Sequence, residues 1–428
     1  MKHPYVVASL ILALSFAPCP NSRAQAPPAA PISVDQAVDE ALHSNPQIRA
    51  QVRRLSLAQL KTTTARSLDD PMLMIRDWQT PLRKPWDLNQ AQFMISLQQT
   101  FPGKDKRDLR ARVAADDVAA TADDLETMRQ EVAANVRQAC SSLLRNADEM
   151  RLHDQQTSVL NQAIAAALAE YTTGKAPQSD VLRAQMALTR LNEHLIELDE
   201  ERDTARAQLN VLMGRAPSDD IEIAGTYRTP AVLPSTEELE RLAIEHRPEL
   251  AALRKQITKS SDESALARLA LKPDYTVAAG YMLMPTGSTY RNAYMAELTM
   301  SLPSLNRARH DGEAKQADSA TDVVRAELDA RTSTVFLEIR QAQIALRSAQ
   351  NRLKLYRDTL LPQAEANFKA STLAYQNSRG EFTNLIDSQN ILLDIRTAYY
   401  KALAAADSGS AQLERAIGTP ILSPERTK

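Results

Sequence analysis

ALHSNPQI at residues 41–48 and AIEHRPEL at residues 243–250 are two versions of one stretch, 202 residues apart. VLRAQMAL at residues 181–188 has its counterpart in LIDSQNIL at residues 385–392, 204 residues later. Single residues recur at nearly the same distance, in the pairs Pro71 and Pro273, Pro102 and Pro303, Tyr171 and Tyr375, Gln185 and Gln389, and Gly214 and Gly418. Solenoid repeats have periods of up to about 50 residues. The chain is therefore expected to contain one duplicated domain.

The composition favours long helices. The 428 residues include only 10 glycines, about a third of the number that average usage of ~7% would give. Aromatic residues make up 4%, too few for a large compact core, while Ala, Leu, Gln, Glu and Arg prevail. The formal net charge is −2, so the chain has no basic field for nucleic acid, and none is expected as a partner.

The first 24 residues are predicted to be a secretory signal peptide. Lys2 precedes an apolar run at residues 6–17, which is shorter than the ~20 residues of a membrane-spanning helix. Residues 22–24, Ser-Arg-Ala, fit a cleavage site. The residues before Cys19 do not form a lipobox, so lipidation is disfavoured. Only Cys140 lies outside this segment, and the mature chain is expected to have no internal disulfide.

Each copy is predicted to contain a helix, two strands and two long helices. Ser33 and Ser235 open the first helices with capping-box patterns, and Pro71 and Pro273 end them. The first copy spans residues 25–230, with strands at about 72–101 and long helices at about 104–213. The second spans residues 231–428, with strands at about 275–302 and long helices at about 304–416.

Two periodicities separate the strands from the helices. Residues 93–98 and 294–302 alternate between an apolar face and a mixed face, a period typical of strands. Apolar residues at spacings of four and three, from Leu188 to Leu212 and from Val335 to Leu360, predict coiled-coil seams. The counterpart seam from Leu392 to Ala416 ends in small residues, so its helices are expected to approach closely or to bend.

Four strands of about ten residues suit a membrane barrel, whose strands of ~9–11 residues span when tilted. Such barrels are apolar outside, mixed inside and ringed by aromatic residues, as Trp78, Trp86, Tyr290 and Tyr294 near the strand ends suggest. Four strands cannot close, because the smallest barrels use about 8, so several chains must share one barrel. The alternative is two soluble hairpins packed on helices. The signal peptide, the duplication and the paired long helices favour the barrel.

This order of elements resembles the TolC-type outer-membrane efflux proteins. The resemblance covers the mature chain and includes SLQQTFPGKDKRDLRAR at residues 96–112 and YTTGKAPQSDVLRAQMALTRLNEHL at residues 171–195. It implies a mainly α fold of long antiparallel coiled-coil helices, with four strands contributing to a trimeric twelve-stranded barrel continued by an α-helical tunnel. It also implies a homotrimer in the outer membrane that extends into the periplasm. The implied partners are a periplasmic adaptor and an inner-membrane pump of the RND type. FPGK followed by LRAR is similar to the heavy-metal cation branch.

The resemblance also implies a periplasmic gate near the turn of the second-copy helices. The family often places acidic residues one turn apart there, and the matching positions are Asn384 and Asp387. Asp387 keeps the acid and Asn384 departs from it. In a trimer one carboxylate becomes a ring of three, which favours cations in a narrow pore. The alternative is a solvent-facing polar pair near a helix start.

The turns between the long helices are the implied adaptor contacts. Tyr171, Gly174 and Lys175 form the first turn and match the family signature. The second turn has Tyr375, Arg379 and Gly380, with Ser378 where glycine is expected. Both could instead be ordinary αα-hairpin turns in which glycine reaches positive φ. Glu297, on the mixed face of its strand, is the candidate charge in the barrel lumen.

No catalytic, metal or cofactor site is expected. The six histidines show no HExxH spacing, and there is no GxSxG elbow, phosphate loop or dinucleotide turn. The predicted function is a passive exit duct of a tripartite efflux system, for metal cations or small toxic compounds. Two alternatives remain at this point: a periplasmic coiled-coil scaffold or adaptor, and an exit duct of a protein secretion system.

Overall fold

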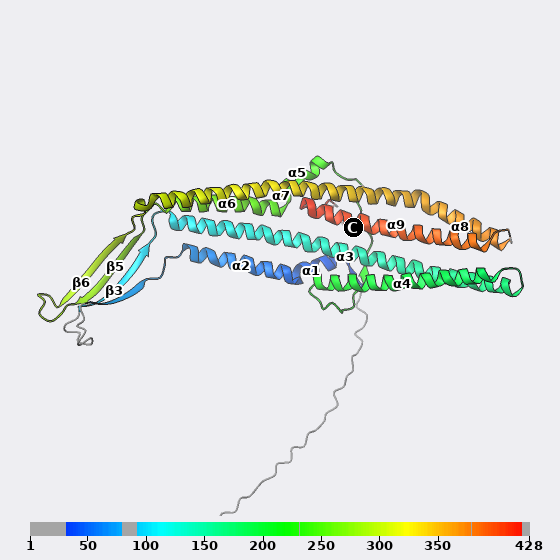
Figure 1. Cartoon of the computed structure of the whole chain (residues 1–428), viewed down its shortest axis with the longest axis horizontal. Helices are drawn as coiled ribbons and strands as arrows, with labels where there is room; N and C mark the ends of the chain where they lie inside the picture. Colours follow the sequence, from blue (N-terminus) through cyan, green and yellow to red (C-terminus); the bar gives the residue numbers. More distant parts are fainter. Residues whose placement is uncertain (1–30, 79–91, 231, 378, 422–428) are drawn as a thin grey trace, which may run out of the picture.

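The computed structural model describes residues 31–78, 92–230, 232–377 and 379–421. The expected signal peptide, Cys19, Trp86 and Ser378 lie outside these residues. The molecule is a long rod (Figure 1). A sheet forms one end, and two helical hairpins turn at the other end.

The order of elements confirms the expected fold class. The first copy contains α1 (Val34–Ser44), α2 (Pro46–Arg66), β2 (Met72–Trp78), β3 (Gln92–Phe101), α3 (Lys106–Thr172) and α4 (Gln178–Leu212). The second contains α5 (Thr236–His246), α6 (Pro248–Leu269), β5 (Tyr275–Leu283), β6 (Asn292–Met300), the 3₁₀ turn η1 (Pro303–Asn306), α7 (Arg307–Leu355), the π turn η2 (Tyr356–Leu360), α8 (Leu361–Gln376) and α9 (Phe382–Ile417). Both copies thus follow the same plan.

The first helix of each copy is broken, whereas the sequence suggested one continuous helix. The breaks fall at Asn45 and Arg247, which have extended backbones because proline disfavours helix in the preceding residue. Each break is hydrogen-bonded to the C-terminal end of the last long helix of its copy, α4 or α9. Asn45 Nδ2 donates to the Leu212 carbonyl at 2.8 Å, and Arg247 donates to the Ala416 carbonyl at 3.0 Å. The two copies therefore use different side chains for the same joint.

The caps that begin these helices differ in detail. Ser33 forms the full predicted capping box with Gln36. Ser235 accepts from the Glu238 N–H, but the Glu238 carboxylate pairs with Arg241. Beside Ser33, strand β1 (Ile32–Ser33) pairs in parallel with β4 (Ile223–Ala224). The sequence analysis missed this short sheet, which fixes the start of the first copy to the link between copies.

The predicted seams form the core of the rod. Helix α3 has 67 residues, so at ~1.5 Å per residue it is about 100 Å long. The described seam residues that are fully buried include Leu198 and Leu209 on α4, Ile339 and Leu346 on α7, and Leu413 on α9. Gly409 of α9 packs against Leu346 of α7, which is the close approach expected from the small residues.

A π turn interrupts the path from α7 to α8. Pro362 lies two residues after the end of η2 (Tyr356–Leu360), in the first turn of α8. A proline in a helix lacks an N–H donor and clashes with the carbonyl four residues earlier. One wider turn relieves that clash while the helix continues. The second-copy hairpin therefore departs from the axis of α7 at a defined point.

The sheet joins the two copies. Its order is β2-β3-β5-β6, all antiparallel, and β3 of the first copy pairs with β5 of the second from Phe93↔Leu283 to Phe101↔Tyr275. Among the described residues, β2 and β6 each pair with one strand only, so both edges are free within the protomer. The sheet is thus open at each side.

The FPGK stretch builds the joint between sheet and helices. A Cβ on Gly103 would lie 2.6 Å from the Pro273 carbonyl oxygen, so only glycine fits. The Gly103 N–H donates to Asp274 at 2.6 Å, and the buried Lys106 ammonium pairs with the same carboxylate at 2.8 Å. Burial opposes ionisation, but these two contacts hold the pKa of Asp274 below its usual value. Both copies are locked together where the strands begin.

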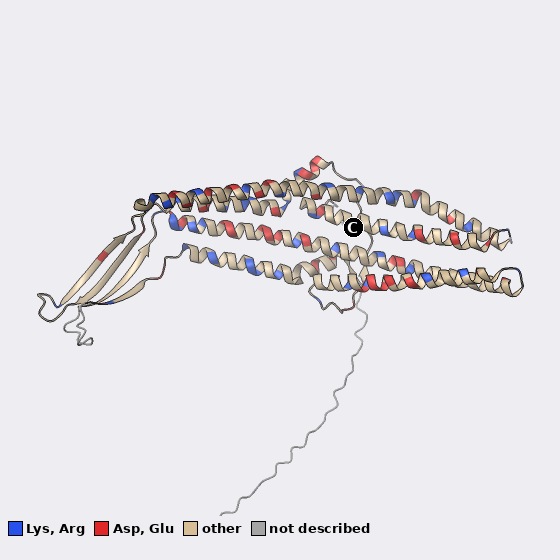
Figure 2. Ribbon diagram, viewed as in Figure 1, with Lys and Arg blue, Asp and Glu red and all other residues tan. Residues whose placement is uncertain are grey.

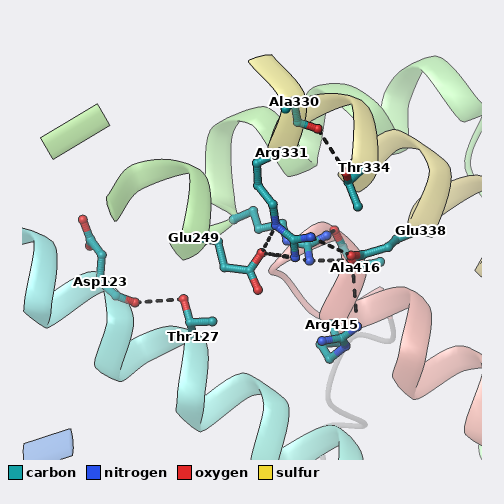
Figure 3. A network of polar contacts seen from close by, with 10 residues as sticks. Asp123, Thr127, Glu249, Ala330, Arg331, Thr334, Glu338, Arg415 and Ala416 are labelled. Carbon is teal, nitrogen blue, oxygen red and sulfur yellow. Dashed lines mark hydrogen bonds and ion pairs between the residues drawn. The ribbon is translucent and has the colours of Figure 1, made fainter. Parts of the chain in front are cut away.

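A partly buried ionic network around the buried Arg247 fixes the middle of the second copy (Figure 3). Arg247 contacts Glu338 at 2.6 Å and Glu249 at 3.1 Å, and Arg331 contacts both carboxylates. Burial alone would raise the pKa of Glu338, but the hydrogen bond from Arg247 and the surrounding guanidinium charges lower it. This contribution to stability is therefore complete at neutral pH and is lost as the pH falls below the usual glutamate range.

Candidate functional site

The outer face of the sheet is apolar and exposed. Leu298 is 69% exposed and Tyr294 92%, and Leu73, Ile75, Leu97 and Val277 on the same face are also exposed. Soluble monomers rarely leave an apolar patch of this kind uncovered. Charged residues lie mostly on the helices, and the sheet carries few (Figure 2). The face is suited to contact with lipid.

The opposite, inner face is mixed, as the alternation predicted. Glu297 lies on it, exposed, and accepts a hydrogen bond from Thr299 at 3.0 Å. Thr100 and Thr276 contact each other at 3.0 Å near the helical end of the same face. Glu297 therefore stands where a lumen charge was expected, and its role there stays a prediction.

The predicted gate residues lie on one exposed face of α9. Asn384 and Asp387 are one turn apart and both exposed, and Asp394 continues the same face two turns further. The neighbouring Leu385 and Ile386 are buried against the first-copy hairpin. Packing of the apolar side thus turns the polar side outward from the protomer. The sequence analysis did not include Asp394.

Asp387 and Asp394 also border a cleft of about 710 Å³ between α9 and the α3–α4 hairpin. Arg183, Arg190 and Lys401 line the same cleft. Its basic groups offset part of the acidic charge at the candidate gate. The gate face is therefore less acidic than the two carboxylates alone suggest.

Two histidines stack inside this cleft. The rings of His153 on α3 and His194 on α4 are 4.6 Å apart and nearly parallel. His153 is 2% exposed, and burial, with the nearby His194, lowers its pKa to about 4, so it is neutral at neutral pH. No sequence pattern pointed to this pair, because the two residues are 41 positions apart and belong to no motif.

The two turns differ in structure. Tyr171, Gly174 and Lys175 are exposed, and Gly174 has φ +72° with open space around it, as the turn signature predicted. Arg379 is also exposed. Gly380 does not have the positive φ of the ordinary-turn alternative; a Cβ there would lie 2.9 Å from the Ala374 Cβ. The second turn uses glycine for packing.

Tyr375 connects the two hairpins. Its hydroxyl donates to Glu170 Oε2 at 2.8 Å, and its ring packs edge-to-face on Phe382. Burial and the Glu170 carboxylate raise the pKa of Tyr375 well above its usual value. Tyr375 is half-buried, whereas Tyr171 and Arg379 are exposed. Tyr171 and Arg379 are therefore better placed than Tyr375 to contact a partner protein.

The described residues contain no His/Cys/Asp/Glu metal cluster and no membrane-spanning helix. Within them no group of three His, Cys, Asp or Glu side chains is arranged to hold a metal ion. None of the helices in that part of the chain combines the length and hydropathy needed to cross a bilayer.

Together, the rod of paired helices and the sheet with an exposed apolar face define an outer-membrane channel subunit. A family model described as outer membrane efflux protein matches residues 37–215. The cobalt-zinc-cadmium resistance protein CzcC of Cupriavidus metallidurans is 24% identical over 396 residues, which is 91% of each chain. Residues 37–215 thus match the outer membrane efflux protein family, and the similarity to CzcC extends over nearly the whole chain.

Solved structures show the same fold. VceC of Vibrio cholerae matches with a TM-score of 0.75 and 18% identity, over 91% of this chain and 97% of VceC. CusC matches with a TM-score of 0.76 and 14% identity, over 90% of this chain and 92% of CusC. With the family-model match and the relative CzcC, this fold identifies an efflux channel of the outer membrane that extends into the periplasm, rather than an enzyme. Members of this family act as trimeric exit ducts with adaptor and inner-membrane pump partners.

Proposed function

We propose that three copies of this chain form one closed duct that passes metal cations out of the cell. The observation that carries the proposal is the open sheet with an apolar exposed face. Unpaired strand edges are not tolerated in lipid. Four strands are too few to close, and three copies give twelve, which exceeds the minimum of about 8. The edge of β2 in one protomer would pair with β6 of the next.

The metal cargo is supported by the relative CzcC, whose name states cobalt, zinc and cadmium resistance. A duct for secreted proteins shares the fold and is the second candidate. Cells without this protein should accumulate Co²⁺, Zn²⁺ or Cd²⁺ when grown in their salts, as measured by elemental analysis. Normal metal content together with a missing secreted protein would favour the second candidate.

The assembly is proposed to be passive and to work with an adaptor and an RND-type pump. The exposed turn residues Tyr171, Gly174, Lys175 and Arg379 are the proposed adaptor contacts, supported by their position at the end of the rod (Figure 1). The proposed processing removes residues 1–24. The proposed repeats are residues 25–230 and 231–428, supported by the matching joints at Asn45 and Arg247.

The proposed gate uses the polar face of α9. Asn384, Asp387 and Asp394 face away from the packed side, so threefold symmetry would arrange each as a ring. Carboxylate rings favour cations. Because Asn384 is neutral and basic residues line the adjacent cleft, the cation preference is expected to be moderate.

Asp387→Asn is expected to lower the cation preference. The change removes three charges per trimer with little change in volume. The reversal potential in a KCl gradient across a planar bilayer should move toward zero, with single-channel steps of similar size. Asp180→Asn is the matched control, since the first copy is expected to lie farther from the axis. An unchanged reversal potential in Asp387→Asn would place the constriction elsewhere.

A further inference from the structure

The inner face of the sheet is rich in methionine. Five of the methionines in the described strands point to this face: Met72, Met74, Met94, Met282 and Met295. The strand register pairs Met94 directly with Met282. The next row runs Met74, Ser96, Gly280 and Met295 across all four strands. The thioethers therefore come from every strand and meet around Ser96.

Hydrophobicity alone does not explain this distribution. The interior of an outer-membrane barrel is normally polar. Within the described strands, Met300 is the one methionine on the opposite face, where Leu, Ile, Val and Tyr supply the apolar surface. A need for apolar bulk would be met equally by leucine. The concentration of thioethers on the inner face indicates that their sulfur atoms, and not only their bulk, have a role, such as binding a ligand.

The sulfur atoms are engaged by polar groups within the face. Gln92 Nε2 contacts Met282 Sδ at 2.9 Å, and Arg76 contacts Met74 Sδ at 3.2 Å. The Arg76 guanidinium lies at one edge of the group and also stacks over Trp78 at 4.8 Å. Arg76 is on the edge strand β2, directly opposite Met94 in the register. A cation would therefore be held from the side of β5 and β6, where Met282 lies next to Met94 and Met295 follows on β6.

Ser96, between these methionines, is unsatisfied. It is 1% exposed, and its hydroxyl has no hydrogen-bond partner among the described residues. Gly280 faces it, and a Cβ there would lie 2.7 Å from the Ser96 Cβ. A buried unpaired hydroxyl costs about 1–3 kcal/mol. Such a group in a native protein calls for an explanation, and an unoccupied ligand position is one.

Thioethers select a particular kind of cation. Soft sulfur ligands favour Cu(I), whereas Zn²⁺ is bound by thiolate, imidazole and carboxylate. The thioether is neutral and the nearby Arg76 is positive, so binding should be weak enough to allow release. A conduit needs sites that a cation can leave.

We propose that Met94, Met282 and Met295, grouped around Ser96, bind soft monovalent cations, Cu(I) or Ag(I). We call these three residues the methionine cluster. Its position on the lumen wall rests on the proposed trimeric duct, but the clustering of the side chains rests on the strand register alone. The cluster extends the proposed cargo beyond the divalent metals of the relative's name.

The test measures Ag⁺ binding to the purified trimer in detergent, in chloride-free nitrate buffer. Every protein compared carries Cys140→Ala, because the free buried thiol of Cys140 would also bind silver. The variant is Met94→Leu/Met282→Leu/Met295→Leu, which conserves volume and hydrophobicity. The control is Met128→Leu/Met186→Leu/Met213→Leu, three methionines on or next to the helices.

The cluster variant should bind Ag⁺ at least about tenfold more weakly, since even indirect supports of a metal site are worth 10–100-fold. The control should bind like the parent, and X-ray absorption of the parent should show sulfur around silver. Equal binding by the cluster variant, or silver without sulfur neighbours in the parent, would overturn the proposal. The absorption spectrum decides even where the variant does not assemble. Conduction is not needed, so failure here leaves the duct itself untouched.

Discussion

Arg247→Met should lower the free energy of unfolding by about 3 kcal/mol, the lower end of the cost of breaking a buried ion pair. The Arg247 side chain is 2% exposed and contacts Glu338, Glu249 and the Ala416 carbonyl. Its removal leaves two partly buried carboxylates with fewer partners and a helix end without its donor. The cost stays at the lower end because Arg331 still contacts both carboxylates.

Arg241→Met provides the matched control. Arg241 also contacts two carboxylates, Glu238 and Glu245, but it is 57% exposed. Exposed ion pairs contribute only about 0–1 kcal/mol. Denaturant unfolding of the trimer in detergent, followed by circular dichroism, should separate the two variants clearly. Equal losses would show that burial of the network contributes little.

Gly418→Ala should be the second strongly destabilising change, by about 2–4 kcal/mol from strain and overpacking together. Gly418 ends α9 with φ +77°, which an alanine adopts only with strain. A Cβ there would also lie 2.7 Å from the His246 carbonyl oxygen and 2.9 Å from the Arg247 Cα. Both neighbours are backbone atoms and cannot rotate away. The joint of the second copy would have to open.

Gly174→Ala separates the cost of backbone strain from the cost of overpacking. Gly174 has φ +72°, but a Cβ there would meet no atom within 4 Å. Only the conformational cost of about 1–2 kcal/mol then applies. The midpoint of thermal unfolding should be clearly lower for Gly418→Ala than for Gly174→Ala when both are measured under the same conditions. Similar midpoints would show that the end of α9 can move away from α5 and α6.

Periodicity predicted most of the fold, because the apolar spacing of a long helix seam and the alternation of a strand each recur over many residues. The bounds of α3 and of the four sheet strands lie close to the expected ones. The break at Asn45 was also encoded, by the proline that follows it. The β1–β4 pair was not, since two residues carry no period and their partners lie about 190 positions away. The network at Arg247 likewise depends on how three helices meet.

The site was predicted less completely. Glu297 lies on the mixed face that the strand alternation indicated, because strand geometry fixes the direction of a side chain. Asp387 is exposed, which fits both a gate and a solvent-facing polar pair, so its role stays a prediction. The contact between Tyr375 and Glu170 joins two turns, and no local pattern reports it. The methionine cluster needs the register between β3 and β5, which brings together residues about 190 positions apart. The methionines are evident in the sequence, but their proximity in space depends on the strand register.

The most direct test of the central claim is the single-channel behaviour of the purified mature protein in a planar bilayer with a KCl gradient. The account predicts small, long-lived steps from a trimer, with a reversal potential on the cation-selective side. A protein that stays soluble without detergent and never inserts would contradict the channel. Anion-selective steps would contradict the acidic gate on α9.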